Sequence, residues 1–191
     1  MKTSLKLIGS LTLICILSGA LLAFVHGATA QRIAEVSQMR TAAAAATVLP
    51  PHASMGELVE MEYDDIRYSI QPAYDADQQR IGYAIQFATE AGYGGEIRMM
   101  LGVDAEGRTT GLAILSGHKE TPGLGAKITE EDFLSRFRSQ PLSSTNWQIR
   151  KDGGIIDEIT AATVSSRAVA DAIQHAAAAF TSFQTRQKEL E

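Results

Sequence analysis

Residues 97–115 read IRMMLGVDAEGRTTGLAIL, and this stretch decides the fold class. Apolar side chains occupy every second position from residue 97 to residue 103, as in a strand with one buried face. The residues DAEG at 104–107 predict a turn, and the apolar residues 111–115 predict the next strand. Because strands joined by so short a turn pair antiparallel, the stretch predicts an antiparallel sheet.

The flanking sequence adds further strands and a helix. Residues 83–87, YAIQF, alternate in the same way and predict an earlier strand. On the other side, Thr129 is a candidate cap for a helix that continues to about Phe137. Short apolar segments at 147–149 and 155–159 predict two more strands.

The last predicted element is an amphipathic C-terminal helix. Its apolar residues recur at steps of four, three and four: Val169, Ile173, Ala176 and Phe180. The succession of strands, helix, strands and helix predicts an α+β fold, with helices packed on a largely antiparallel sheet. We expect this domain to span residues 56–191.

An uncharged run of 19 residues, LIGSLTLICILSGALLAFV at 7–25, lies near the N-terminus. As a helix rising about 1.5 Å per residue it is about 28 Å long, close to the hydrocarbon thickness of a bilayer. Lys2 and Lys6 precede the run, so the positive-inside rule places the N-terminus in the cytoplasm and the domain on the periplasmic side. We therefore expect residues 1–30 to form a single-pass anchor in the cytoplasmic membrane, in contact with lipid through residues 7–25.

A cleaved signal peptide is the alternative for this segment, because residues 28–30, ATA, form an A-x-A cleavage site. The apolar run exceeds the roughly 7–15 residues usual in signal peptides, which favours the anchor. Residues 31–55 are expected to be a linker. Its alanine-rich part, 31–46, suits a short helix that ends at Leu49 and the two prolines after it.

Composition excludes several classes of function. Hydrophobic residues make up 45% of the chain and charged residues 20%, which is typical of a folded protein. Beyond residue 30 the chain carries 15 basic and 22 acidic residues, a net charge of −7, so we expect no nucleic-acid partner. Cys15 is the single cysteine, which excludes an internal disulfide and a protein-ligated iron–sulfur cluster. Any electrons must be carried by an organic cofactor.

The loop HKETPGLGAK at 118–127 has the composition of a ligand-binding loop. Pro122 fixes its own φ, and the two glycines leave room for a flat ligand to approach the backbone. An ordinary turn between a strand and a helix is the alternative. His118 has no second ligand at metal-binding spacing, so we expect no metal site there.

The segment DEITAATVSS at 157–166 admits three interpretations. Thr160, Thr163 or Ser165 is a candidate N-cap for the final helix. Alternatively, one hydroxyl is a site of attachment, because the alanines leave space for a bulky group and a helix N-terminus stabilises a phosphate. A serine hydrolase is a weaker hypothesis, because no G-x-S-x-G elbow surrounds these hydroxyls.

These residues resemble a known family. DEITAAT at 157–163 resembles the D-x-x-[S/T]-G-A-T motif at which a flavin transferase links FMN, through its phosphate, to the last threonine. ETPGLG at 120–125 resembles a signature of the same FMN-binding domains. Together with YGG at 93–95 and the anchor, the chain resembles the G subunit of the Rnf-type electron transport complex over nearly its whole length.

The resemblance implies FMN covalently bound to Thr163 as a phosphoester. The motif recognised by the flavin transferase would comprise Asp157, Thr160, Ala162 and Thr163. The residues expected to surround the FMN are Thr160, Ala162, Val164, Ser165 and Ser166 from this motif and Glu120, Thr121, Leu124, Gly125 and Lys127 from the loop. The family usually has glycine where this chain has Ala161, so a positive φ at that position would be strained.

The resemblance also implies a function. The chain would be an electron-transfer subunit of a membrane complex that couples electron transfer between ferredoxin and NAD to ion translocation, with the other membrane subunits as partners. No side chain is expected to act as a catalytic acid or base, and no stand-alone catalysis is expected. The alternatives are the C subunit of a sodium-translocating NADH:quinone reductase, which is generally longer, and a non-redox membrane-anchored binding module.

Overall fold

The computed structural model of the protein describes residues 2–116 and 120–190. The chain divides into two compact units, Met1–Arg40 and Thr41–Glu191. The second unit begins within the long helix α1, Lys2–Val48, and so includes residues expected to belong to the linker. By length and composition, Lys6–Val48 is able to cross a membrane, and its apolar window has no side chain buried in the structure.

Residues 31–46 are helical as expected, but they do not form a short helix, because α1 continues without interruption through this segment. Neither glycine nor proline occurs between residues 28 and 48, and alanine has the highest helix propensity. The helix therefore ends only at Val48, just before the expected Leu49 and its prolines.

Six strands form one sheet in which every pairing is antiparallel. The order is β1-β3-β4-β5-β6, and β2 also pairs with β3. The strands are β1 Ser54–Met55, β2 Val59–Tyr63, β3 Ile66–Tyr74, β4 Arg80–Gly92, β5 Gly95–Asp104 and β6 Thr109–Ser116. The three strands expected from residues 83–87, 97–103 and 111–115 are β4, β5 and β6, and the α+β prediction is confirmed.

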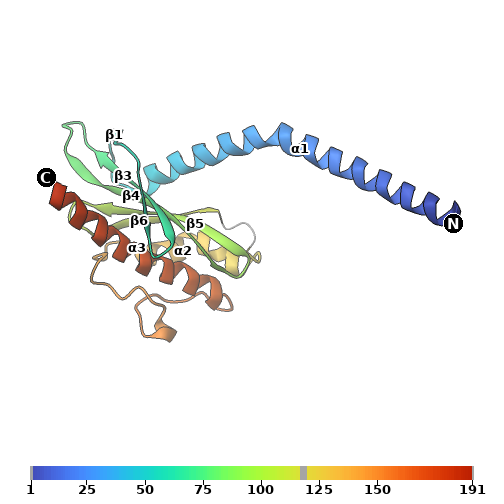
Figure 1. The fold of residues 1–191 in the computed structure, drawn as a ribbon. Helices are drawn as coiled ribbons and strands as arrows, with labels where there is room; N and C mark the ends of the chain where they lie inside the picture. The colour runs from blue at the N-terminus through green and yellow to red at the C-terminus, as the bar shows by residue number, and fades with distance from the viewer. Residues whose placement is uncertain (1, 117–119, 191) are drawn as a thin grey trace. The chain divides into compact units, whose positions relative to one another are not determined.

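The helix α3, Thr163–Leu190, lies along one face of the sheet (Figure 1). Its expected apolar residues Val169, Ile173, Ala176 and Phe180 are all buried. They pack in one core with the side chains that alternate along β4 and β5. This packing fixes the N-terminus of α3 against the sheet.

The end of α1 packs on the opposite face of the sheet. Val48 is buried there beside Ala84 and Met100. Gly102 and Gly111 allow this approach, since a Cβ on Gly102 would lie 2.1 Å from the Val48 carbonyl oxygen. The Thr110 hydroxyl donates a hydrogen bond to the same carbonyl. Both faces of the central strands are therefore covered.

The segment between the sheet and α3 differs from expectation. Instead of one helix capped by Thr129, it contains the 3₁₀ turn η1 Gly125–Thr129, the short helix α2 Glu131–Leu134 and the 3₁₀ turn η2 Ser135–Phe137. The Thr129 hydroxyl donates back to the Ala126 carbonyl and caps nothing. Phe133 and Phe137 are buried, so core packing decides this segment and not helix propensity.

The two strands expected at 147–149 and 155–159 are also wrong. Only an isolated bridge joins Ile149 to Ile156, and the 3₁₀ turn η3, Arg150–Asp152, lies between them. The apolar residues in these segments, Trp147, Ile149 and Ile156, are buried in the core without forming strands. A short apolar segment in a loop gives the same pattern as a strand.

Candidate functional site

A cavity of about 500 Å³ lies where the loop after β6 meets the start of α3. Its size falls in the usual range for sites that bind small molecules. The lining residues are Tyr93, Glu120, Thr121, Leu124, Gly125, Ala161, Ala162, Thr163, Val164 and Ser165. The cavity therefore brings together the two motifs of the sequence.

Glu120 joins three segments of the chain beside the cavity. It is 4% exposed, and its Oε2 accepts a 2.6 Å hydrogen bond from the buried Ser165 hydroxyl on α3. Its Oε1 accepts a 3.0 Å hydrogen bond from the Gly94 amide between β4 and β5. A Cβ on Gly125 would lie 2.1 Å from Oε2, so only glycine fits at that position beside the carboxylate. These contacts fix one wall of the cavity.

Large apolar side chains line the cavity while remaining open to solvent. Tyr93, Leu124 and Val164 are 72%, 42% and 47% exposed. They come from the β4–β5 turn, the loop and α3, so they converge from three places in the sequence. An apolar wall with a few polar groups suits a flat aromatic ligand.

A strained turn places Thr163 at the first position of α3. Ala161 has φ +64°, which is the positive φ expected at this position. The Ser166 hydroxyl donates to the Ala162 carbonyl at 3.0 Å and accepts from the Ile159 amide at 2.9 Å. Ala162 directly precedes the helix, so none of the candidate hydroxyls occupies the N-cap position. Ser166 instead stabilises the turn from within the helix.

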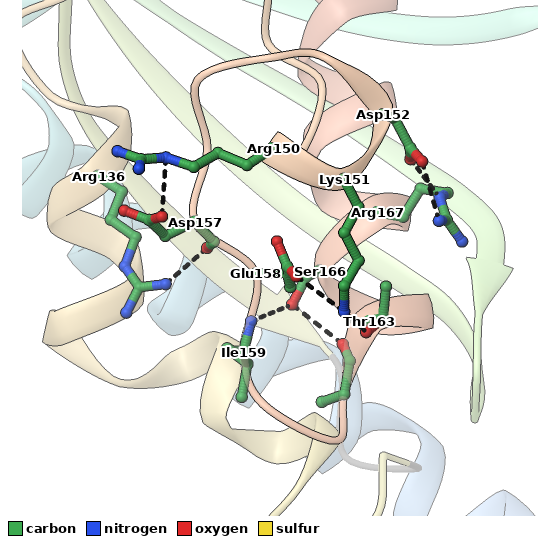
Figure 2. Close-up of polar contacts among 11 residues, drawn as sticks. Arg136, Arg150, Lys151, Asp152, Asp157, Glu158, Ile159, Thr163, Ser166 and Arg167 are labelled. Carbon is green, nitrogen blue, oxygen red and sulfur yellow. Dashed lines mark hydrogen bonds and ion pairs between the residues drawn. The ribbon is translucent and has the colours of Figure 1, made fainter.

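Lys151 approaches Thr163 from η3 (Figure 2). Its Nζ lies 3.5 Å from the Thr163 hydroxyl and 2.8 Å from Oε1 of Glu158. The hydrogen bond from Lys151 holds the pKa of Glu158 below its ordinary value. Thr163 itself is half-buried. The hydroxyl is thus accessible and lies beside a cation.

The structure brings most of the expected site residues into the cavity, but four of them lie elsewhere. Thr160 and Lys127 line a separate neighbouring cavity of about 240 Å³. Ser166 is fully buried, with its hydroxyl engaged in the turn. Asp157 is exposed, and its carboxylate pairs with Arg150 at 2.8 Å (Figure 2).

The sequence reasoning did not assign Tyr93, Ala161 or Lys151 to the site. Two of these residues could have been found from the sequence, because Tyr93 belongs to the YGG segment and Ala161 lies within the DEITAAT motif. Lys151 had no such signal, because it reaches Thr163 only through the folding of the loop at 147–156.

No metal centre is formed by the described residues, among which no three His, Cys, Asp or Glu side chains gather. His118 of the loop lies outside the described residues.

Comparison with known proteins gives two findings. Residues 92–178 match the FMN-binding domain, and every residue that lines the cavity falls within this range. The chain is 33% identical to the G subunit of the ion-translocating oxidoreductase complex of Shewanella piezotolerans, over 91% of this chain and 87% of that protein. It is 33% identical to the G subunit from Aliivibrio fischeri, over 95% and 90%, and 31% identical to that from Methanosarcina acetivorans, over 96% and 97%. The chain belongs to the family of G subunits of ion-translocating oxidoreductase complexes.

Proposed function

We propose that this protein relays electrons within a membrane-bound ion-translocating complex, through FMN bound covalently to Thr163. The observation that carries the proposal is the cavity in which DEITAATVSS and ETPGLG meet, inside the FMN-binding domain. Thr163 is the first residue of α3, and its hydroxyl is accessible beside Lys151. A non-redox binding module does not account for the FMN-binding domain.

The residues of the cavity fit this cofactor. The apolar surfaces of Tyr93, Leu124 and Val164 suit an isoalloxazine ring, and the Glu120 and Thr121 side chains supply polar groups at its edge. At the other end, Lys151 and the first turn of α3 supply the positive potential that a phosphate requires. Bound FMN supplies the redox chemistry, while the chain supplies position and electrostatics.

We propose that attachment is a phosphoryl-type transfer catalysed by a flavin transferase. Thr163 Oγ1 bonds to the flavin-side phosphorus of a flavin dinucleotide, the P–O bond of its phosphoanhydride breaks, a nucleoside monophosphate departs with the bridging oxygen, and the hydroxyl proton passes to solvent or to a base of the transferase. Asp157 and Thr160 lie outside the cavity, on the accessible surface of the motif. This placement supports a role for them in recognition by the transferase, with no contact to the attached flavin.

We further propose that the complex couples electron transfer between ferredoxin and NAD to ion movement, and that this subunit acts on the periplasmic side. The anchor with Lys2 and Lys6 at its start supports that orientation. A covalent link suits this compartment, because a reversibly bound cofactor is lost when its free concentration is low.

The test is co-expression of the full chain with a flavin transferase. We expect the denatured protein to remain yellow and fluorescent, with its intact mass increased by that of FMN less one water. Thr163→Val keeps the shape of the side chain but removes the nucleophilic oxygen, so it should abolish the added mass completely. Peptide mass spectrometry checks the position of the flavin.

Thr129→Val is the matched control, because Thr129 is an exposed threonine outside the cavity. It should carry as much flavin as the wild type. A colourless wild type, or flavin retained in Thr163→Val, contradicts the proposal.

A further inference from the structure

The environment of Lys151 is unusual for an exposed lysine. Its side chain is 61% exposed, yet its ammonium contacts two groups, Glu158 at 2.8 Å and the Thr163 hydroxyl at 3.5 Å. Among the charged side chains of the described residues, Lys151 is the one that donates a hydrogen bond to the Thr163 hydroxyl. Glu158 is only 17% exposed, so it holds the ammonium from the side nearer the core.

The backbone on either side of Lys151 is anchored to two different elements. Arg150 pairs with Asp157 of the motif at 2.8 Å, and Asp152 receives two hydrogen bonds from Arg167 of α3, at 2.6 and 3.2 Å. Figure 2 shows both pairs flanking Lys151, whose side chain runs toward Thr163. The ion pairs of Arg150 and Asp152 therefore hold the backbone from which the flexible Lys151 side chain extends toward Thr163.

The loop that carries these pairs is itself fixed. Trp147 is buried, and its indole donates to the Leu142 carbonyl at 2.9 Å. The 3₁₀ turn closes at Gly153 with φ +91°, and a Cβ on Gly154 would lie 1.9 Å from the Gln148 carbonyl oxygen. These contacts hold the backbone of the loop, and the exposed Lys151 side chain is held toward Thr163 by its ion pair with Glu158.

From this geometry we infer that Lys151 is a positioning residue that binds the phosphate of the group attached to Thr163. The inference rests on the proposed function and deepens it. An ionised phosphodiester on Thr163 Oγ1 places anionic oxygens within reach of an ammonium that already contacts that oxygen. Lys151 then shares its charge between Glu158 and the phosphate and fixes the flavin at its phosphate end.

The residues around Lys151 define what competes for its charge. Glu158 contacts it directly, Asp152 is engaged by Arg167, and Asp157 is engaged by Arg150. A phosphate at Thr163 therefore competes mainly with Glu158, which contacts the ammonium, while Asp152 attracts it from a greater distance. Lys151→Arg keeps the charge, whereas Lys151→Met keeps the apolar stem and removes it.

The experiment measures the ³¹P chemical shift of the full chain after co-expression with the transferase, once intact mass has shown the added flavin and peptide mass spectrometry has placed it on Thr163. We expect a shifted resonance in Lys151→Met, a resonance close to that of the wild type in Lys151→Arg, and no change in Lys127→Met. Lys127 is the matched control because it is exposed and lines the neighbouring cavity and not the cavity that contains Thr163.

A second measurement needs no variant of Lys151. The rate of amine labelling at Lys151 in the wild-type chain should fall several-fold on flavin attachment, while the rate at Lys127 stays constant. Unchanged labelling at Lys151, or a Lys151→Met resonance that coincides with that of the wild type, overturns the inference about Lys151 and leaves Thr163 in place. A wild type without added mass overturns the proposed function itself.

Discussion

At the scale of single residues, Ala161 has a strained backbone in the turn that leads to Thr163. Its φ of +64° lies in the left-handed region, where a Cβ crowds the following carbonyl. The turn is retained because Ser166 and the Ile159 carbonyl bind its backbone on both sides. The turn places Thr163 at the first position of α3, in the wall of the cavity.

Ala161→Gly should therefore raise the free energy of unfolding by about 1 kcal/mol, because glycine adopts positive φ without the steric cost. The measurement is a urea titration of the full chain in detergent, followed by the fluorescence of Trp147, the single tryptophan.

Ala162→Gly is the matched control. Ala162 is buried and does not have positive φ, so the change adds freedom to the unfolded chain, removes a buried methyl group and should lower the free energy of unfolding by about 1–2 kcal/mol. Equal losses in the two variants contradict the assignment of strain to Ala161.

At the scale of elements, β3 contains a buried hydroxyl that lacks a partner. Tyr68 is fully buried against Phe87, with ring centroids 5.9 Å apart, and its hydroxyl makes no hydrogen bond among the described residues. Burial raises the pKa of Tyr68 to about 12, from 10.0, and the nearby Asp64 carboxylate adds to the effect. The folded state therefore favours the neutral phenol more strongly than the unfolded state does.

The sign of the pH dependence follows from this raised pKa. The contribution of Tyr68 to stability is fully present below pH 10 and is lost as the pH rises toward 12. From pH 8 to pH 11 the wild type should lose about 1.4 kcal/mol more free energy of unfolding than Tyr68→Phe. Urea titrations of both chains at the two pH values, followed by circular dichroism, test this. Parallel losses contradict it.

The elements also show how far sequence reasoning reaches. The alternation in β4 and β5, the apolar segment of β6 after its turn and the helical period of α3 were sufficient to predict these elements. The strands β2 and β3 were missed although VEMEY at 59–63 and IRYSI at 66–70 alternate apolar and polar residues, whereas β1, with two residues, is too short to show a pattern. Thr163 and the loop at 120–125 came from the family motif. Lys151 depends on tertiary packing, which local patterns do not encode.

At the scale of the whole molecule, the chain combines one apolar N-terminal helix with one FMN-binding domain. The family and the helix give a single-pass membrane-anchored protein. The orientation that we propose rests on charge alone, because Lys2 and Lys6 are the cations that precede the apolar run. The proposal that the flavin acts on the periplasmic side thus depends on two residues far from Thr163 in the sequence.

Protease accessibility tests this orientation. Trypsin added to spheroplasts should digest residues 56–191, which carry exposed lysines and arginines, whereas inverted membrane vesicles should protect them. The intact mass of the membrane-bound protein should still include residues 1–30. Digestion only in inverted vesicles contradicts the predicted orientation, and a mature chain that begins at Gln31 shows cleavage after Ala30 instead of a retained anchor.

Replacing both Lys2 and Lys6 by glutamate should increase the fraction of chains with the domain in the cytoplasm, because the cationic bias that holds the N-terminus there is gone. In chains of this variant that have the domain in the cytoplasm, trypsin added to spheroplasts should leave the domain intact. This protection is the control that trypsin does not cross the membrane.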